Sequence, residues 1–378
     1  MNQMIKIMLL ATASVTITRI EALWDGVTVP LTSIDGLPVP PLDVLPPVNQ
    51  PWFSKYNLAG VPVLPQTSNK TGTAAPIYAN PDILACKKPT DWAISYDDGP
   101  SQYTEGVLSN LTAAKEKVTF FVVGSRIIER PDLLLKTYQL GHQIACHTWS
   151  HPYLTSISND EIIAEMEWCV KAVSYVTGVK PRYMRPPFGD EDARVRGVLV
   201  AMGFEIVIWN IDSTDYLSGP VTDGALSNPS YDQKWIVGNI TSFINERKGQ
   251  QVPPAQGVIS LEHDLYYTSS QEAPNVLKAV KAANYTILPV GTCMGDSKWY
   301  SNQATMTATH TTMATATKHA TTIAPAKLAT MRPATLATRT PGSSATESQG
   351  SGVDVITPIF SIYFIMILTI LSIYTLVA

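Results

Sequence analysis

Between Cys86 and Cys293 the chain alternates short apolar runs with stretches of helical periodicity, and this alternation limits the possible folds more than any other feature. Runs rich in β-branched and aromatic residues predict strands at 92–96, 118–123, 205–209, 257–261 and 286–290. Apolar residues at helical spacing predict helices at 104–115, 159–176, 191–202, 235–246 and 271–283. Strands that alternate with helices over roughly 200 residues favour one parallel α/β domain, either open or closed into a barrel. Residues that carry chemistry are then expected at the carboxyl ends of the strands.

Two adjacent carboxylates, Asp97 and Asp98, directly follow the first predicted strand in the segment Ser-Tyr-Asp-Asp-Gly-Pro at 95–100. Neighbouring carboxylates repel each other unless a cation or hydrogen-bond donors offset their charge. Aspartate, glycine and proline are also common turn residues. By itself, this segment therefore fits an ordinary turn as well as it fits a catalytic or metal-binding site.

Two histidines, His147 and His151, follow the short apolar stretch at 143–146. Imidazoles four residues apart can bind one metal where the backbone is helical or turning. Thr148 stands where the zinc-protease signature requires glutamate, so that mechanism is excluded. Of six histidines in the chain, two lie in a Thr/Ala-rich segment near the C-terminus, which leaves four in the predicted domain.

Three further polar segments, at 185–190, 212–216 and 261–264, come later in the predicted domain. Each is a weak signal alone, because a Pro-Pro stretch is usually a rigid loop and a His-Asp pair is usually a surface turn. Together, the five segments could place one arginine, several aspartates and three histidines on a single strand-end rim around one metal ion.

In this order, the five segments resemble the five motifs of the polysaccharide deacetylase family of carbohydrate esterases. The resemblance covers residues 92 to 290, and the Asp-Asp-Gly-Pro and His-x-x-x-His elements make it specific. It implies a distorted, incomplete (β/α) barrel with fewer than eight complete units. With its Pro-rich N-terminal arm and its C-terminal tail, the chain looks most like the fungal cell-wall chitin deacetylases of that family.

The resemblance also implies the ligands of a metal site. Asp98, His147 and His151 would bind one divalent ion, for which Zn²⁺ is the best candidate and Co²⁺ a possible one. Two imidazoles and a carboxylate leave open positions for water and substrate. The ion would activate the water and polarise the acetamide carbonyl.

By the same resemblance, Asp97 would be the general base and would contact the substrate, and Arg185 would orient it. His263 would be the general acid that protonates the leaving amine, and Asp215 would hydrogen-bond to it.

The remaining implied roles concern the acetyl group. The backbone N–H of Phe188, with the metal, would stabilise the oxyanion, and Tyr216 and Leu261 would wall the acetyl pocket. Tyr216 stands where the family usually has tryptophan, so the shape of this pocket is in question. Ser95-Tyr96 stands where Thr-Phe is commoner. Because no ligand, base or acid is lost, the sequence predicts an active enzyme.

The two ends of the chain predict secretion and anchoring. One early cation, Lys6, precedes an apolar core at 7–17, so 1–22 is interpreted as a signal peptide. The Pro-rich segment 23–85 predicts an extended arm that packs on a catalytic domain at 86–295. The Thr/Ala/Pro-rich segment 301–350 predicts a disordered, O-glycosylated stalk. The uncharged tail that ends segment 351–378 indicates a GPI-attachment signal, with a plain tail anchor as the alternative.

Four cysteines in a secreted chain allow three disulfide pairings. Cys86 and Cys293 flank the predicted domain and are expected to close it, while Cys146 and Cys169 would pair or stay buried. The sequons at Asn69, Asn110, Asn239 and Asn284 agree with a secreted glycoprotein.

The sequence thus predicts hydrolytic N-deacetylation of N-acetylglucosamine units in chitin, to chitosan and acetate, in cell-wall remodelling. The enzyme would sit on the outer face of the plasma membrane and in the wall, with cell-wall glycans as partners. The motifs leave open a deacetylase of peptidoglycan or xylan, and a catalytically silent glycan-binding wall protein. A nucleic-acid binder is excluded, because the net charge is −4 and no Lys/Arg-rich block exists.

Overall fold

The computed structural model describes residues 30–67, 82–222, 225–250 and 254–302. The predicted signal peptide, Asn69, nearly all of the predicted stalk and the predicted anchor signal lie outside these residues. Within the described part of the chain, no helix is both long enough and apolar enough to cross a membrane.

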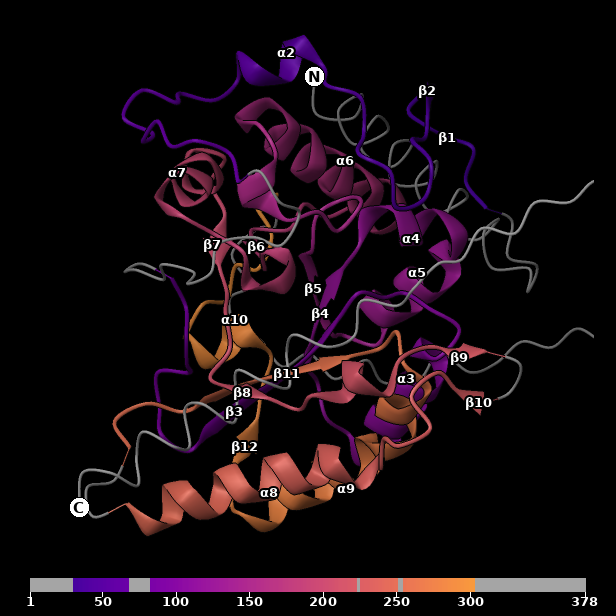
Figure 1. Cartoon of the computed structure of the whole chain (residues 1–378), viewed down its shortest axis with the longest axis vertical. Helices are drawn as coiled ribbons and strands as arrows, with labels where there is room; N and C mark the ends of the chain where they lie inside the picture. Colours follow the sequence, from indigo (N-terminus) through magenta and orange to yellow (C-terminus); the bar gives the residue numbers. More distant parts are fainter. Residues whose placement is uncertain (1–29, 68–81, 223–224, 251–253, 303–378) are drawn as a thin grey trace, which may run out of the picture. The chain divides into compact units, whose positions relative to one another are not determined.

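An eight-stranded, fully parallel sheet forms the centre of the fold (Figure 1). Its strands, in spatial order, are β7 (Glu205–Ile206), β6 (Tyr183–Met184), β5 (Gln143–Cys146), β4 (Thr119–Val122), β3 (Asp91–Asp97), β11 (Val258–His263) and β8 (Ile211–Asp212), while β12 (Thr286–Ile287) pairs with the start of β3. The two longest strands, β3 and β11, lie side by side, and every residue of β3 is buried.

The sheet curves into an incomplete barrel. The path from β7 to β8 crosses seven strands, which would span about 29 Å if the sheet were flat. Only residues 207–210 join these two edge strands, and so short a link reaches at most about 18 Å. The edges must therefore approach each other, which confirms the predicted distorted, incomplete (β/α) barrel.

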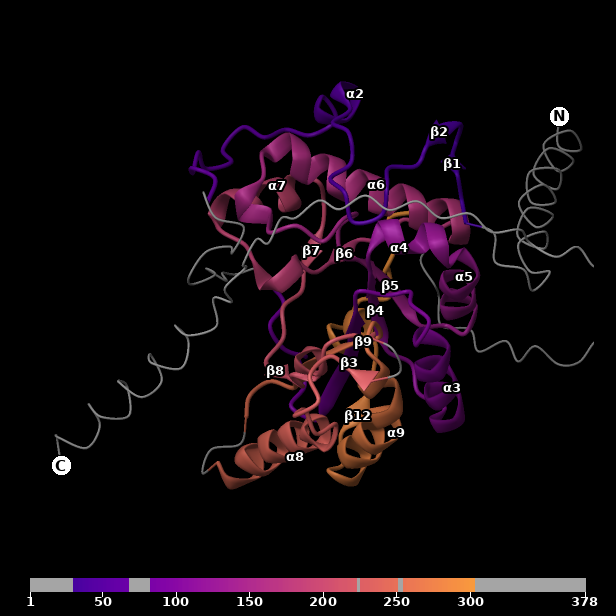
Figure 2. The same ribbon diagram turned by 45° about the vertical axis from the view of Figure 1, so that its right-hand side comes forward.

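Helices cover the outside of the sheet: α3 (Thr104–Ala114), α4 (Gly124–Glu129), α5 (Pro131–Gln139), α6 (Asn159–Thr177), α7 (Ala193–Ala201), α8 (Lys234–Gly249), α9 (Tyr267–Ala282) and the short α10 (Val290–Cys293). Figures 1 and 2 show α8 and α9 lying side by side. Three 3₁₀ turns, at Leu154–Ser156, Pro187–Gly189 and Asp215–Ser218, and the two-residue strands β9 (Val221–Thr222) and β10 (Ala225–Leu226) complete the described elements of the domain.

All five predicted helices are present, with shifted ends, but α4 and α5 were not predicted. The predicted strand at 205–209 ends at Ile206, apart from one isolated parallel bridge at Val207, and the predicted strand at 286–290 is wrong beyond Ile287. The ends of α6 follow its local signals. Ser158 and Glu161 form a capping box at its start, and Gly178 ends it in a left-handed conformation.

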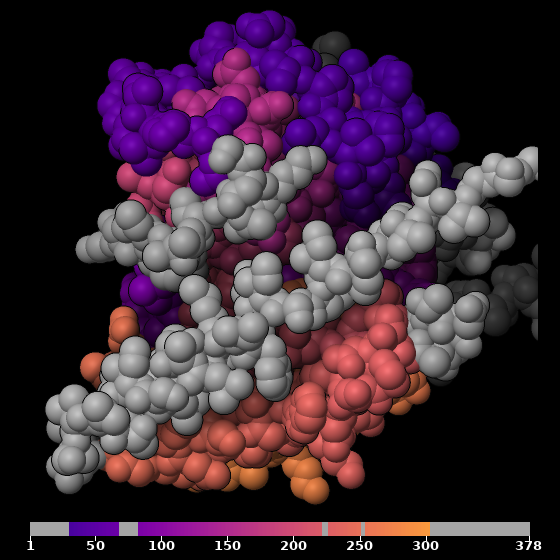
Figure 3. Space-filling view, in the orientation of Figure 1, coloured from indigo at the N-terminus to yellow at the C-terminus, as the bar shows by residue number. Residues whose placement is uncertain are grey.

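The N-terminal arm, residues 30–67, lies across the helical layer, where Figure 3 shows it in indigo over the magenta helices. It is not wholly extended as predicted. β1 (Ser33–Ile34) and β2 (Leu37–Pro38) form a small hairpin, and α2 (Gln50–Phe53) is a single helical turn. The turn tolerates a proline at its start, because the missing N–H has no helical partner there.

The arm contacts the domain at several points. Trp52 packs edge-on against Trp168 of α6, with ring centroids 5.7 Å apart. The N–H of Leu31 donates to the carbonyl of Ile128, at 2.9 Å. At the far end of the arm, the N–H of Thr67 donates to the carbonyl of Thr155 in the first 3₁₀ turn, at 3.0 Å.

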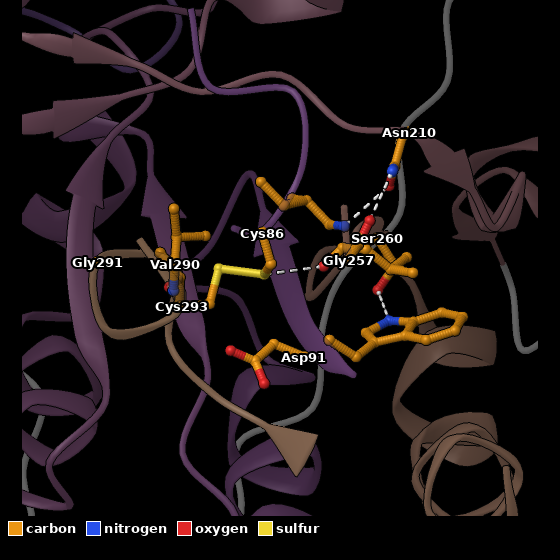
Figure 4. The surroundings of a disulfide bond; sticks show 12 residues. Cys86, Asp91, Asn210, Gly257, Ser260, Val290, Gly291 and Cys293 are labelled. Atoms are coloured by element: carbon orange, nitrogen blue, oxygen red, sulfur yellow. Dashed lines mark hydrogen bonds between the residues drawn. A yellow bond between two sulfur atoms is a disulfide. The ribbon is translucent and has the colours of Figure 1, made fainter. Parts of the chain in front are cut away.

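A disulfide between Cys86 and Cys293 confirms the predicted closure of the domain (Figure 4). It lies at the amino ends of β3 and β11, where the N–H of Gly257 donates to the carbonyl of Cys86, at 2.8 Å. A side chain at Gly257 would collide with the carbonyl of Asp91, so the close approach requires glycine. Cys146 and Cys169 are free and buried, which was one of the two predicted outcomes. Packing onto the domain extends past its predicted end at 295, since the side chain of Asn302 donates to the carbonyl of Gly178.

Candidate active site

A pocket of about 280 Å³ opens at the carboxyl ends of the strands. Eight of the ten predicted site residues line it: Asp97, Asp98, His147, His151, Phe188, Tyr216, Leu261 and His263. The other two, Arg185 and Asp215, are fully buried and contact lining residues. The five segments, which span 170 residues of sequence from 95 to 264, therefore meet in one place.

Asp98, His147 and His151 form the one group among the described residues whose side chains could together hold a metal ion, with ligand atoms within 4.8 Å of one another. The Asp98 Oδ1 atom lies 3.2 Å from His151 Nε2 and 3.5 Å from His147 Nε2. It is buried and has no hydrogen-bond partner. An orphaned carboxylate oxygen facing two imidazole nitrogens fits a divalent cation, which would supply the missing partner.

The protonation of His147 also fits a metal ligand. Its Nδ1 lies 2.8 Å from the carbonyl of Arg185, so Nδ1 carries the proton and Nε2 keeps a free lone pair. Burial, followed by the charge of His151, holds the pKa of His147 well below its usual range. The pKa of Asp98 is also well below its usual range, because the neighbouring histidines, His151 first, outweigh the effect of its burial. Both groups are thus held in the form that binds a cation.

The backbone around these ligands is strained. Asp98, Thr148, His151 and Phe188 all have positive φ, at 76°, 67°, 60° and 60°. A left-handed conformation costs a residue other than glycine about 1–2 kcal/mol. Such strain persists only where the surrounding structure fixes it, and it gathers at functional sites.

Asp97 forms an ion pair with Arg185, whose Nη1 lies 2.7 Å from Asp97 Oδ1. Arg185 also donates to the hydroxyl of Ser95, at 2.8 Å, and its guanidinium packs over the ring of Phe121. Burial raises the pKa of Asp97 and the charge of Arg185 lowers it, which leaves the pKa at about 6. Asp97 is therefore mostly ionised at neutral pH, yet basic enough to accept a proton.

His263 ends β11 beside Asp97, its register partner on the neighbouring strand β3, and both line the pocket. Its ring Nδ1 lies 2.7 Å from Asp215 Oδ1, and its backbone N–H donates to Asp215 Oδ2, at 2.7 Å. Burial alone would lower the pKa of His263, but the charge of Asp215 and its hydrogen bond outweigh burial and raise the pKa to about 10. The ring is therefore an imidazolium at neutral pH. A base and an acid thus line the same pocket as the candidate metal ligands.

Aromatic and apolar side chains form the rest of the wall. The ring of Phe188 is half exposed, stacks on Tyr153 at 4.0 Å, and meets the ring of His151 at 4.5 Å. Tyr216 packs edge-on against His263, with centroids 5.7 Å apart, and Leu261 is buried beside it.

Three lining residues were not predicted: Trp209, Asp212 and Tyr266. Asp212 begins the polar segment 212–216 and comes soon after the predicted strand at 205–209, so its position in the sequence was a usable signal. Trp209 and Tyr266 carry no local signal, because their place in the wall depends on how the loops fold back. A fourth residue behind the site, Glu165, was also missed.

Comparisons with known proteins agree with this geometry. The profile of the family described as polysaccharide deacetylase matches residues 85–207. Chitin deacetylase 1 of Cryptococcus neoformans var. grubii is 33% identical over 322 residues, which is 76% of this chain and 66% of that protein. Chitin deacetylases of Amylomyces rouxii and Pestalotiopsis are 35% and 32% identical over 58% of this chain, and the matches cover 50% and 69% of those proteins. The chain thus spans about two thirds of the length of the Cryptococcus protein and about half of the length of the Amylomyces protein.

Among solved structures, the chitin deacetylase of Colletotrichum lindemuthianum is 27% identical and has a TM-score of 0.51. The match covers 59% of this chain and 96% of that one. It supports the barrel architecture described above.

Proposed function

The chain belongs to the polysaccharide deacetylase family, and we propose that it is a metal-dependent hydrolase that removes N-acetyl groups from chitin. The products would be chitosan and acetate. The observation that carries this proposal is that one pocket is lined by the three candidate ligands, Asp98, His147 and His151, together with a base, Asp97, and an acid, His263. The chitin deacetylases among its relatives support the choice of substrate.

Asp98, His147 and His151 would hold one divalent cation, and their donor set suits Zn²⁺ first and Co²⁺ second. When bound, the cation lowers the pKa of a water molecule and polarises the acetamide carbonyl. Asp97 would accept a proton from the attacking water, because its carboxylate is ionised at neutral pH and held in place by Arg185. The water oxygen would then bond to the carbonyl carbon.

Collapse of the tetrahedral species breaks the bond between carbon and nitrogen. His263 donates its proton to the departing nitrogen, so the products are a free amine and acetate. Asp215 keeps the ring charged until that transfer. The backbone N–H of Phe188 would help to stabilise the oxyanion, while Tyr216 and Leu261 would enclose the acetyl methyl group.

The decisive test is acetate release from chitin oligomers by the purified protein, stripped of metal and then resupplied with Zn²⁺ or Co²⁺. Activity that disappears on chelation and returns with metal is the expected result. Peptidoglycan and acetylated xylan are assayed in parallel, since preference for either would move the protein to another substrate. A protein that binds chitin and metal but releases no acetate from any of the three would instead be a silent glycan-binding protein.

We further propose that the protein is secreted and held on the outer face of the plasma membrane and in the cell wall by a GPI anchor, with the segment 301–350 as a glycosylated stalk. This follows from the predicted signal peptide and the uncharged C-terminal tail. Release of the protein from intact cells by a phosphatidylinositol-specific phospholipase C tests the anchor. Retention after that treatment would contradict it.

A further inference from the structure

We propose that Glu165 is a positioning residue of the metal site, a buried carboxylate on α6 that holds the loop between His147 and His151 in its strained shape. This rests on the proposed function, because it assumes that both histidines bind metal. Glu165 lies outside the five polar segments and is fully buried.

Glu165 accepts three hydrogen bonds from two consecutive residues of the loop. Its Oε2 atom accepts from the N–H of Trp149, at 2.6 Å, and from the N–H of Ser150, at 2.8 Å. Its Oε1 atom accepts from the hydroxyl of Ser150, at 2.5 Å. Trp149 is itself fully buried, so in the folded protein its N–H relies on Glu165 for a hydrogen-bond acceptor.

The carbonyls of the same loop are bound by a second element. The N–H groups of Gly124 and Ser125, at the start of α4, donate to the carbonyls of Thr148 and Trp149, at 2.9 and 3.0 Å. A side chain at Gly124 would meet the Trp149 ring at 2.7 Å, which shows how closely the two segments pack. The start of α4 and the carboxylate of Glu165 thus act together as a clamp on the loop.

This clamp explains how the loop keeps two left-handed residues. Thr148 and His151, with φ of 67° and 60°, bracket the two residues that Glu165 binds. An unheld loop would relax toward ordinary φ values, and His151 would then turn away from Asp98 Oδ1, 3.2 Å from its Nε2. Groups that orient metal ligands in this way commonly change metal affinity by 10- to 100-fold when they are removed.

The test is the zinc affinity of the full-length protein, measured by competition with a chromogenic chelator, so it does not depend on activity. Glu165→Ala should bind Zn²⁺ at least about tenfold more weakly than wild type. Glu165→Gln should stay within about threefold, since its amide oxygen can accept both N–H groups and its NH₂ can donate to the Ser150 hydroxyl. The visible spectrum of the Co²⁺-loaded Glu165→Ala protein should change as well, because one imidazole is displaced.

Glu167→Ala is the matched control. Glu167 lies on the same helix but binds Lys55 and Tyr56 of the arm, at 2.9 and 2.5 Å. The control should lose some stability and keep its zinc affinity. If Glu165→Ala does not fold, Glu165→Asp decides, because its carboxylate is one methylene too short to reach the loop, and an unchanged affinity would overturn the inference.

Wild-type zinc affinity in folded Glu165→Ala would refute the role of Glu165 and leave the proposed function intact. A wild-type protein that binds neither Zn²⁺ nor Co²⁺ would refute the proposed metal site, and this inference with it.

Discussion

Replacing Asp215 by asparagine should change the pH dependence of the enzyme far more than its activity at acid pH. Asp215 contacts both the ring and the backbone N–H of His263 and is fully buried. Its charge and hydrogen bond overcome the effect of burial and raise the pKa of His263 from 6.5 to about 10. Without that charge, burial is opposed only by the smaller effects of the charges of Asp98 and Asp97, so the pKa should fall toward 6.5. A change of about 3.5 units corresponds to about 5 kcal/mol.

The sign of the effect follows from the role of His263 as an acid, since activity is lost as the pH rises through its pKa. At pH 8.5 a group with a pKa of about 10 is about 97% protonated, whereas one with a pKa of about 6.5 is about 1% protonated. The Asp215→Asn enzyme should therefore lose about 100-fold in kcat/KM at pH 8.5, and only a small fraction of that at pH 5.5. Acetate release between pH 5 and 10 measures the alkaline limb, with saturating zinc in both proteins.

Ser269→Ala provides the control, because it removes a hydrogen bond from Ser269 to the same carboxylate and keeps the charge. The alkaline limb of its pH–activity profile should move by less than about one pH unit. If the limb of Asp215→Asn also lies within one unit of wild type, Asp215 does not set the charge of His263, and the assignment of acid and partner fails.

Three further outcomes are expected. Asp97→Asn should keep its zinc affinity and lose about 10²–10⁴-fold in kcat, since it removes the base and leaves the ligand cluster intact; kcat within tenfold of wild type would contradict that role. Replacing Cys86 and Cys293 by serine should lower the free energy of unfolding by about 2–5 kcal/mol, because the bridge spans 207 residues, and an unchanged denaturation midpoint would count against it. Zinc at about 100 times its Kd should add about 2.7 kcal/mol to the stability of the stripped protein, seen as a higher Tm, and an unmoved Tm would argue against a specific site.

The elements that sequence reasoning found are those with enough residues to show a period. Strand β3 has seven residues and α6 has nineteen, so alternation and helical spacing are visible in both. Strands β6 and β8 have two residues each and can show no period. Helix α4 has six residues and begins with Gly-Ser, and α5 begins with a proline, so their sequences look like turns. Tertiary packing, rather than local preference, makes these segments regular.

The candidate site divides in a similar way. Asp97, His147 and His263 stand out because polar residues directly after apolar runs are unusual. Glu165 does not stand out, since a glutamate within a long helix is ordinarily a solvated charge. Its carboxylate points inward because Trp149 and Ser150 present unpaired N–H groups there, and only the folded chain brings these groups together.

The folded part of the protein begins earlier in the chain than the segment that the family profile matches, because the arm packs on the catalytic domain. The profile begins at residue 85, yet Trp52 of the arm covers Trp168, and Asp43 lies 3.7 Å from Arg126, whose guanidinium also donates to the carbonyl of Asp98, at 2.8 Å. A shortened protein that began at the profile boundary would expose the indole of Trp168 to water and would tend to aggregate. In chimaeras that exchange the catalytic domain between relatives, the arm should therefore be transferred together with the barrel that it covers.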